Sequence, residues 1–322
     1  MRYLGLRLLQ SILLLLGISL LSFLFLALAP GNFFDEMRLN PQISSETLTK
    51  LRTQYEMDRP LPVRYVRWLE SVVRGEMGFS FAYNAPVAPL LWTRACNTLK
   101  LTGIATLLTW LLALPLGILS AEKRRGIDRS LTFVMATLVA TPELLLALAL
   151  LLLAVRTGWL PVGGMSSVGG ESQGLWGRLT DTTLHLILPV AVLVFSGLPI
   201  LFRHTRSAMI EALDLPFVRA ATAHGIPRWQ IVLRHALPVA ANPLISFFGL
   251  FVGSLLSASL LVEVVVSWPG LGPFLLEAIL GRDVYVVIGS VMFASVFLIS
   301  GTLLTDVLLL AFDPRIRAKR LA

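Results

Sequence analysis

Long runs of apolar residues alternate along this chain with shorter stretches rich in arginine, glycine and proline. A bilayer core about 30 Å thick requires roughly 20 apolar residues in one helix. Six runs are long enough to cross it: residues 8–29, 98–120, 130–155, 183–202, 237–262 and 284–312. The pattern therefore predicts an all-α polytopic membrane protein with six transmembrane helices.

The composition supports a membrane protein over a soluble one. Hydrophobic residues make up 56% of the chain, charged residues 14%, and the mean hydropathy is +0.78. Soluble domains carry about 25% charged residues and could not cover this much apolar surface. Cys96 is the single cysteine, which excludes an intramolecular disulfide and a cysteine-cluster metal site.

The first apolar run could instead be a secretory signal peptide. Arg2 and Arg7 precede it, and the sequence ALA at 27–29 resembles a cleavage site. The run is 22 residues long, whereas the apolar core of a signal peptide has roughly 7–15. A retained transmembrane helix over residues 1–29 is therefore favoured.

The distribution of basic residues predicts the orientation of the chain. If the N-terminus lies inside, the inner segments contain fifteen Lys and Arg residues, whereas the two short outer loops contain three, Arg156, Arg178 and Arg282. Inner loops of membrane proteins are enriched in Lys and Arg. We expect both termini to be cytoplasmic, and this topology explains the net charge of +8 without nucleic-acid binding.

Residues 30–97 form a long outer segment with two predicted amphipathic helices. The first, over 44–57, begins with two serines and Glu46, which suit a helix N-terminus. The second, over 60–75, has apolar residues at helical spacing and ends at Gly75. A connector of this length usually has a function. We expect an external cap with a docking or gating role.

Residues 203–235 form the longest inner loop of the 98–322 core. A helix is predicted over 209–223, followed by a break at Gly225 and a second helix that begins with Pro227 at its first position. We call this helix–turn–helix segment within residues 203–235 the bracket. It could act as a rigid lever that moves the transmembrane helices before and after it. An interfacial amphipathic helix is the alternative.

The inner loop resembles the EAA loop of ABC-importer permeases. Residues 219–225 read RAATAHG, and nine residues later 235–238 read HALP. Arg219 stands where the pattern has Glu, as is familiar in the dipeptide, oligopeptide and nickel branch. Five further stretches also resemble that branch: the first span, the part of the outer segment at 57–81, GWLPVGG (158–164), SWPGLG (267–272) and FDPRIR (312–317). The chain is therefore similar to the first, "B"-type permease of that branch.

This resemblance implies a set of partners. A second permease would complete the translocation path, and two cytoplasmic ATPases would bind Mg²⁺ and hydrolyse ATP. An extracytoplasmic binding protein would deliver the substrate. The complex would lie in a bacterial or archaeal plasma membrane. This chain itself would hold no cofactor. The coupling contacts with the ATPase would come from Glu211, Arg219, Ala220, Ala221, Ala223 and Gly225.

The substrate implied by the resemblance is a di- or oligopeptide, with nickel chelates, glutathione, opines or oligosaccharides as alternatives within the same class. A secondary transporter is the alternative from another class, but no internal repeat is evident. The chain has no GxxxxGK[ST], HExxH or GxSxG motif. We therefore expect neither an enzyme nor a metal site.

Two further groups of residues are candidates for the path itself. Glu143, beside Pro142, falls in the middle of the third predicted span, where a carboxylate usually faces a cavity or a partner. It could contact substrate or make a structural hydrogen bond. Near the outer end of the fifth span, residues that break a helix follow an acidic residue and suggest an external gate: Glu263, Trp268, Pro269, Gly270 and Gly272.

Overall fold

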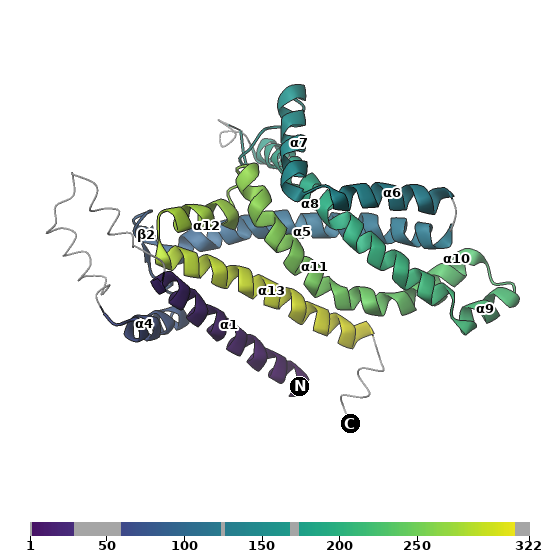
Figure 1. Ribbon diagram of the computed structural model, residues 1–322, viewed down its shortest axis with the longest axis horizontal. Coiled ribbons are helices and arrows are strands. Elements are labelled where there is room, and N and C mark those ends of the chain that lie inside the picture. Colours follow the sequence, from purple (N-terminus) through teal and green to yellow (C-terminus); the bar gives the residue numbers. More distant parts are fainter. Residues whose placement is uncertain (1, 29–58, 124–125, 168–173, 313–322) are drawn as a thin grey trace. The chain divides into compact units, whose positions relative to one another are not determined.

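The computed structural model describes residues 2–28, 59–123, 126–167 and 174–312, which are helical almost throughout (Figure 1). The long helices are α1 (Arg2–Leu28), α5 (Val87–Glu122), α8 (Leu175–Leu213), α11 (Leu237–Val265) and α13 (Val284–Phe312). The shorter helices are α4 (Leu61–Val73), α6 (Gly126–Ala140), α7 (Glu143–Thr157), α9 (Pro216–Ala223), α10 (Arg228–Gln230) and α12 (Leu271–Leu280). Two-residue strands, β1 (Phe79–Ser80) and β2 (Ala85–Pro86), pair antiparallel.

The described residues confirm an all-α polytopic membrane protein. Five helices are long and apolar enough to cross a bilayer, and the pair α6–α7 makes a sixth span if it is counted as one. Leucines on the outside of these helices are widely exposed, for example Leu13 at 59% and Leu107 at 68%. Such side chains require lipid or a partner subunit rather than water.

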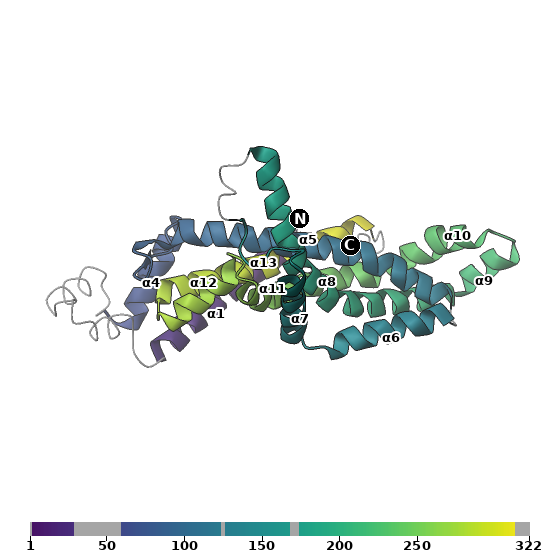
Figure 2. The same cartoon turned by 90° about the horizontal axis from the view of Figure 1, so that it is seen from above.

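The third span differs from the expected continuous helix over 130–155. It is broken into α6 and α7, which are bent by 98° (Figure 2). Pro142 causes the break because it lacks an N–H and its ring clashes with the preceding turn. It adopts an extended conformation (φ −57°, ψ 137°) before the first residue of α7. Glu143 therefore begins a helix instead of lying within one.

The described residues divide into two compact units. The first contains those up to Asn97 together with Pro269–Phe297. Here α4 packs through Trp68 on Phe23 of α1 and Ile288 of α13, and the Ser19 and Tyr65 hydroxyls are 2.9 Å apart. The helix predicted over 60–75 is thus confirmed as α4; Arg74 is its C-cap, and Gly75 follows with a positive φ of 87°. The predicted helix over 44–57 lies outside the described residues.

The second unit contains the described residues Thr98–Trp268 and those from Leu298 onward. Its core is built mainly around α8 and α11, whose fully buried side chains include Leu193, Leu201 and Phe251. Residues of α5, α6 and α7 complete the same cluster. Near the end of α8 a separate cluster surrounds Met209 and Ile231, and it supports the inner loop.

Candidate functional site

The inner loop forms a helical bracket between α8 and α11 (Figure 1). The helix expected over 209–223 is interrupted, because α8 continues to Leu213 and a separate α9 begins at Pro216. Pro216 cannot donate the hydrogen bond that would continue α8, and its fixed φ suits the first position of a new helix. Residues 203–213 thus extend the span itself.

Gly225 forms the break that the sequence predicts after α9. Its φ is +73°, and the N–H groups of Gly225 and Ile226 donate to the carbonyls of Thr222 (3.0 Å) and Ala221 (3.2 Å). This pair of bonds is a Schellman motif, in which a left-handed residue satisfies the last carbonyls of a helix. Beyond its chain neighbours, no atom lies within 4 Å of the point that a Cβ would occupy at Gly225. Its backbone angle, and not tight packing, therefore requires glycine.

The return from α9 to the membrane is continuous. Pro227 caps α10 instead of occupying its first helical position, and α10 runs into a π-helical segment, Ile231–Ala236, and then α11. π-Helical turns insert an extra residue and often occur at functional positions. α10 is therefore joined to α11 without a loop.

The two faces of α9 have different surroundings. Val218 is 2% exposed and packs in the cluster around Met209 and Ile231, whereas Ala220 and Ala223 are exposed. Ala221 is half-buried against the same cluster. Only part of the small-residue stretch is thus free for contact with another protein.

Two aromatic side chains on the bracket were not among the residues expected to couple. Phe217 on α9 is 44% exposed and Trp229 on α10 is 57% exposed. Exposed aromatic residues are enriched at the centres of protein interfaces. Their proximity in sequence to the RAATAHG stretch was the available signal.

Arg219 and Glu211 have local partners. The Nη2 and Nε of Arg219 donate to the carbonyl of Asp214 at 3.0 and 3.3 Å, which caps the end of α8. Glu211, on the last turns of α8, accepts a bond from Ser207 at 3.3 Å. Arg219 therefore orients α9 on α8. Glu211 belongs to α8, whereas the other coupling candidates lie in α9 or directly after it.

A bidentate salt bridge between Arg206 and Asp128, here called the clamp, stabilises the last part of α8 and was not predicted from the sequence. Arg206 binds Asp128 of α6 with two parallel bonds, Nε–Oδ1 at 2.7 Å and Nη2–Oδ2 at 2.8 Å. The Ser120 hydroxyl of α5 donates to the same carboxylate. Bidentate pairs are strong and geometrically specific. The clamp joins three helices next to the bracket.

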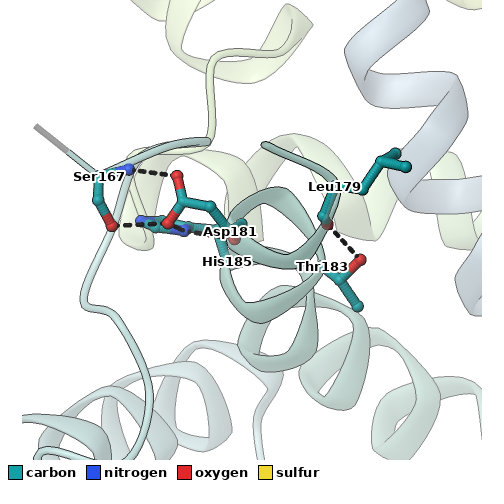
Figure 3. A network of polar contacts seen from close by, with 5 residues as sticks. All are labelled: Ser167, Leu179, Asp181, Thr183 and His185. Atoms are coloured by element: carbon teal, nitrogen blue, oxygen red, sulfur yellow. Dashed lines mark hydrogen bonds and ion pairs between the residues drawn. The ribbon is translucent and has the colours of Figure 1, made fainter. Parts of the chain in front are cut away.

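At the other end of α8, the GWLPVGG segment docks on the end of α11. The Gly164 N–H donates to the carbonyl of Val266 at 3.3 Å, and a Cβ on Gly163 would lie 3.2 Å from that oxygen. Ser167 holds the same segment to α8, because its N–H and hydroxyl donate to the carboxylate of Asp181 at 2.7 and 2.6 Å (Figure 3). Two motifs about a hundred residues apart are thus brought together.

The candidate gate residues are partly hidden. Glu263 and Trp268 are fully buried, and the backbone N–H of Trp268 donates to the backbone carbonyl of Glu263 at 2.8 Å. Trp268 therefore does not project from the turn, since it packs with Val262 and Val266 in the core of the second unit.

Pro269, Gly270 and Gly272 belong to the first unit and lead into α12. Asn97 donates to the Pro269 carbonyl at 2.9 Å, and Ser80 donates to Asp283, just after α12, at 2.6 Å. The Tyr83 hydroxyl bonds Glu277 of α12; burial and this carboxylate raise the pKa of Tyr83 to about 12. The turn and α12 are thus held by the end of the 30–97 segment.

Glu143 has an unusual environment at the α6–α7 bend. Its Oε1 is buried and has no hydrogen-bond partner among the described residues. The Leu138 carbonyl, which Pro142 cannot satisfy, accepts a bond from the Thr141 N–H at 3.2 Å. A bond from Glu143 to that freed carbonyl is therefore not needed.

Within residues 2–28, 59–123, 126–167 and 174–312, no group of three or more His, Cys, Asp or Glu side chains could hold a metal ion.

Comparison with known proteins gives a consistent assignment. The family model "Binding-protein-dependent transport system inner membrane component" matches residues 113–318, and the corresponding N-terminal model matches residues 1–102. The oligopeptide transport system permease protein AppB of Bacillus subtilis (strain 168) is 34% identical, covering 96% of this chain and 97% of the relative. The dipeptide transport system permease protein DppB of Escherichia coli (strain K12) is 32% identical, covering 95% of each.

A solved structure has a similar fold. The inward-facing MetNI methionine ABC transporter aligns with a TM-score of 0.51 at 20% identity, covering 71% of this chain and 95% of that one. The resemblance to ABC-importer permeases, drawn from the inner loop and the ordered motifs, is confirmed. The chain belongs to the family of binding-protein-dependent transport system inner membrane components.

Proposed function

We propose that this chain is one of two permease subunits of an ATP-driven importer for di- and oligopeptides. The observation that carries the proposal is 32–34% identity over nearly the whole chain to permeases named for dipeptide and oligopeptide transport. A second permease would complete the path, two ATPase subunits would bind ATP and Mg²⁺, and a binding protein would deliver the peptide. The chain itself would hold no cofactor.

The bracket would be the contact with an ATPase. Its exposed surface contains Phe217, Ala220, Ala223 and Trp229, and Val218 fastens the opposite face to the cluster under α8. Arg219 and Gly225 would act by orienting α9, and Ala221 by packing beneath it. Glu211 would contribute at the margin of this surface. A push on α9 would then reach α8 and α11 through short, rigid connections.

The orientation would place both termini and the bracket in the cytoplasm, with 30–97 and the α11–α12 turn outside. Ser267 is exposed in that turn and can therefore report on which side of the membrane it lies. In a Cys96→Ser background, Ser267→Cys should react with a membrane-impermeant maleimide in intact cells or spheroplasts. Thr222→Cys, exposed on α9, should react only after permeabilisation. The reverse pattern would invert the topology.

Glu143, with Pro142 setting the bend, would line the translocation path and contact a cationic part of the peptide. The support is its buried oxygen, which lacks a partner among the described residues. Glu143→Gln preserves size and removes charge. We expect uptake of lysine-containing dipeptides to fall about tenfold, as for loss of a charge-assisted hydrogen bond, and uptake of neutral dipeptides to change less than twofold.

The comparison of the two peptide classes separates this role from a structural one. If Glu143 instead bonds the partner permease, Glu143→Gln should alter both classes equally and weaken co-purification of the two permeases. Equal transport at unchanged assembly would contradict a role in reading substrate charge.

The external gate would involve Glu263, Trp268, Pro269, Gly270 and Gly272. α11 ends at Val265 and α12 begins at Leu271, so residues 266–270 form a short connection between the two helices. Movements of α11 would reach α12 through it.

Reconstitution tests the proposal as a whole. Proteoliposomes containing both permeases, both ATPases and the binding protein should take up labelled dipeptide only when ATP is supplied. A secondary transporter would behave differently: this chain alone would accumulate peptide when an ion gradient is imposed. That second result would overturn the importer assignment.

A further inference from the structure

The clamp lies beside a crossing at which α5 and α8 are in close contact. A Cβ on Gly117 of α5 would lie 2.7 Å from the side chain of Thr205 and 3.2 Å from the backbone nitrogen of Arg206. The crossing therefore has no room for one added methyl group. Ala121, one turn further along α5, is 1% exposed and packs in the cluster around Met209. α5 and α8 are thus fixed to each other next to the clamp.

The first turn of α6 is attached to this crossing by polar bonds. Asp128 accepts both bonds of the clamp and a third from the hydroxyl of Ser120, one turn beyond Gly117 on α5. The other residues within 126–130 are exposed, and the first apolar side chain of α6 to reach the core is Leu131. The start of α6 is therefore held to α5 and α8 through the carboxylate of Asp128.

The far end of α6 is the bend that contains Glu143. α6 has 15 residues and ends at Ala140, and it leads into α7 at Pro142 and Glu143 (Figure 2). At 1.5 Å per residue it is about 22 Å long. A packed helix is a stiff element that can carry a displacement from one end to the other. The clamp and Glu143 thus lie at opposite ends of one helix.

A second ion pair in the same region is weaker by geometry. Glu122 of α5 lies 3.6 Å from Arg228 of α10 through a single contact, and the two side chains are 31% and 48% exposed. In the clamp the corresponding values are 16% for Asp128 and 32% for Arg206, and there are two bonds. Exposed single pairs contribute little, whereas bidentate pairs are stronger and fix an orientation. Glu122 therefore serves as a matched comparison for Asp128.

We propose that Asp128 and Arg206 are positioning residues for transport, which make α6 follow the end of α8 and so set the bend at Glu143. This rests on the proposed function, in which an ATPase displaces the bracket that follows α8. Neither side chain would touch peptide or nucleotide. Without the clamp, the ATPases would still hydrolyse ATP, but the bend would not respond, and less peptide would be imported for each ATP.

The first test measures peptide imported per ATP hydrolysed by the complete importer in proteoliposomes. Asp128→Asn/Arg206→Gln removes both charges together, so that no unpaired buried charge remains. We expect the ratio to fall about fivefold or more, the lower range of coupling between sites, while ATP hydrolysis and co-purification stay close to those of the wild type. Glu122→Gln should keep the wild-type ratio.

Arg206→Lys is a milder variant that keeps the charge and loses the planar fork of donors. It should give an intermediate ratio, because a single bond replaces the bidentate pair. If the double variant does not assemble, Arg206→Lys provides the same comparison with Glu122→Gln.

The second test observes the bend itself. Ala140 is exposed at the end of α6, so a nitroxide can be attached to Ala140→Cys in a Cys96→Ser background. In the wild-type importer the electron paramagnetic resonance spectrum should differ between the nucleotide-free and vanadate-trapped states. In the Asp128→Asn/Arg206→Gln variant the two spectra should be the same. A clamp that only stabilises the fold would lower the melting temperature and leave the spectral change intact.

Failure of the proposed function would be recognised separately, because the wild type itself would then show no ATP-dependent uptake. Where the wild type does import peptide, either of two results would overturn the role of the clamp. One is a ratio of uptake to hydrolysis in the double variant equal to that of Glu122→Gln. The other is a nitroxide spectrum that responds equally in the wild type and the double variant, or that does not respond in the wild type.

Discussion

Gly225→Val is expected to lower ATP-driven peptide uptake at least tenfold while the protein still inserts and assembles. Position 225 has a φ of +73°, and a β-branched residue there costs roughly 1–3 kcal/mol of backbone strain. Beyond the chain neighbours, no atom lies within 4 Å of the added Cβ, so the strain can be relieved only by rotating the chain between α9 and α10. Rotation would misdirect the exposed face of α9, and ATP hydrolysis would continue without transport.

Two controls separate this effect from general destabilisation. Gly225→Asn should retain most of the uptake, because asparagine tolerates the left-handed conformation. Gly158→Val imposes a similar strain at the end of α7, where φ is +66° and the space around a Cβ is equally open. Equal losses for Gly158→Val and Gly225→Val would show that strain alone, anywhere in the chain, impairs the importer.

Ala220→Arg is expected to weaken binding of the ATPase subunit at least tenfold. Ala220 is exposed on the side of α9 away from the buried Val218, so a large charged side chain would project into whatever receives the helix. Overpacking a close-fitting interface costs roughly 1–3 kcal/mol, and about 1.4 kcal/mol corresponds to a factor of ten. The measurement is the dissociation constant of purified ATPase for the detergent-solubilised permease pair.

Ala220→Ser is the matched control at the same position, since it adds one small polar atom and should leave affinity within twofold. Ala221→Arg is a less selective variant, because Ala221 packs against the permease's own cluster and the change would disturb α9 itself. Unchanged affinity for Ala220→Arg would remove Ala220 from the contact surface.

Features set by local backbone chemistry could be predicted from the sequence. Gly225 lies at the predicted break after a short helix and has a positive φ, and most of the long apolar runs form helices long enough to span a bilayer. Two prolines interrupt helices that the surrounding sequence predicts to be continuous. Pro142 bends the third span by 98°, and Pro216 separates α9 from α8. Around Pro142, apolar residues on both sides favour helix equally and concealed the break.

Features set by contacts between distant segments could not be predicted. The Asp128–Arg206 clamp joins residues 78 positions apart, and in a single sequence neither residue identifies the other. The burial of Trp268 depends in the same way on which side chains of the second unit surround it. Periodicity shows that a face is apolar, but not which element covers it.

Cross-linking at α9 tests the central claim most directly. A photoreactive phenylalanine analogue at Phe217, which is 44% exposed, should cross-link to the ATPase subunit in the assembled importer. The same analogue at Trp176, 84% exposed in the first turn of α8, should not. An ATPase cross-link from position 176 and none from position 217 would contradict the assignment of α9 as the coupling helix.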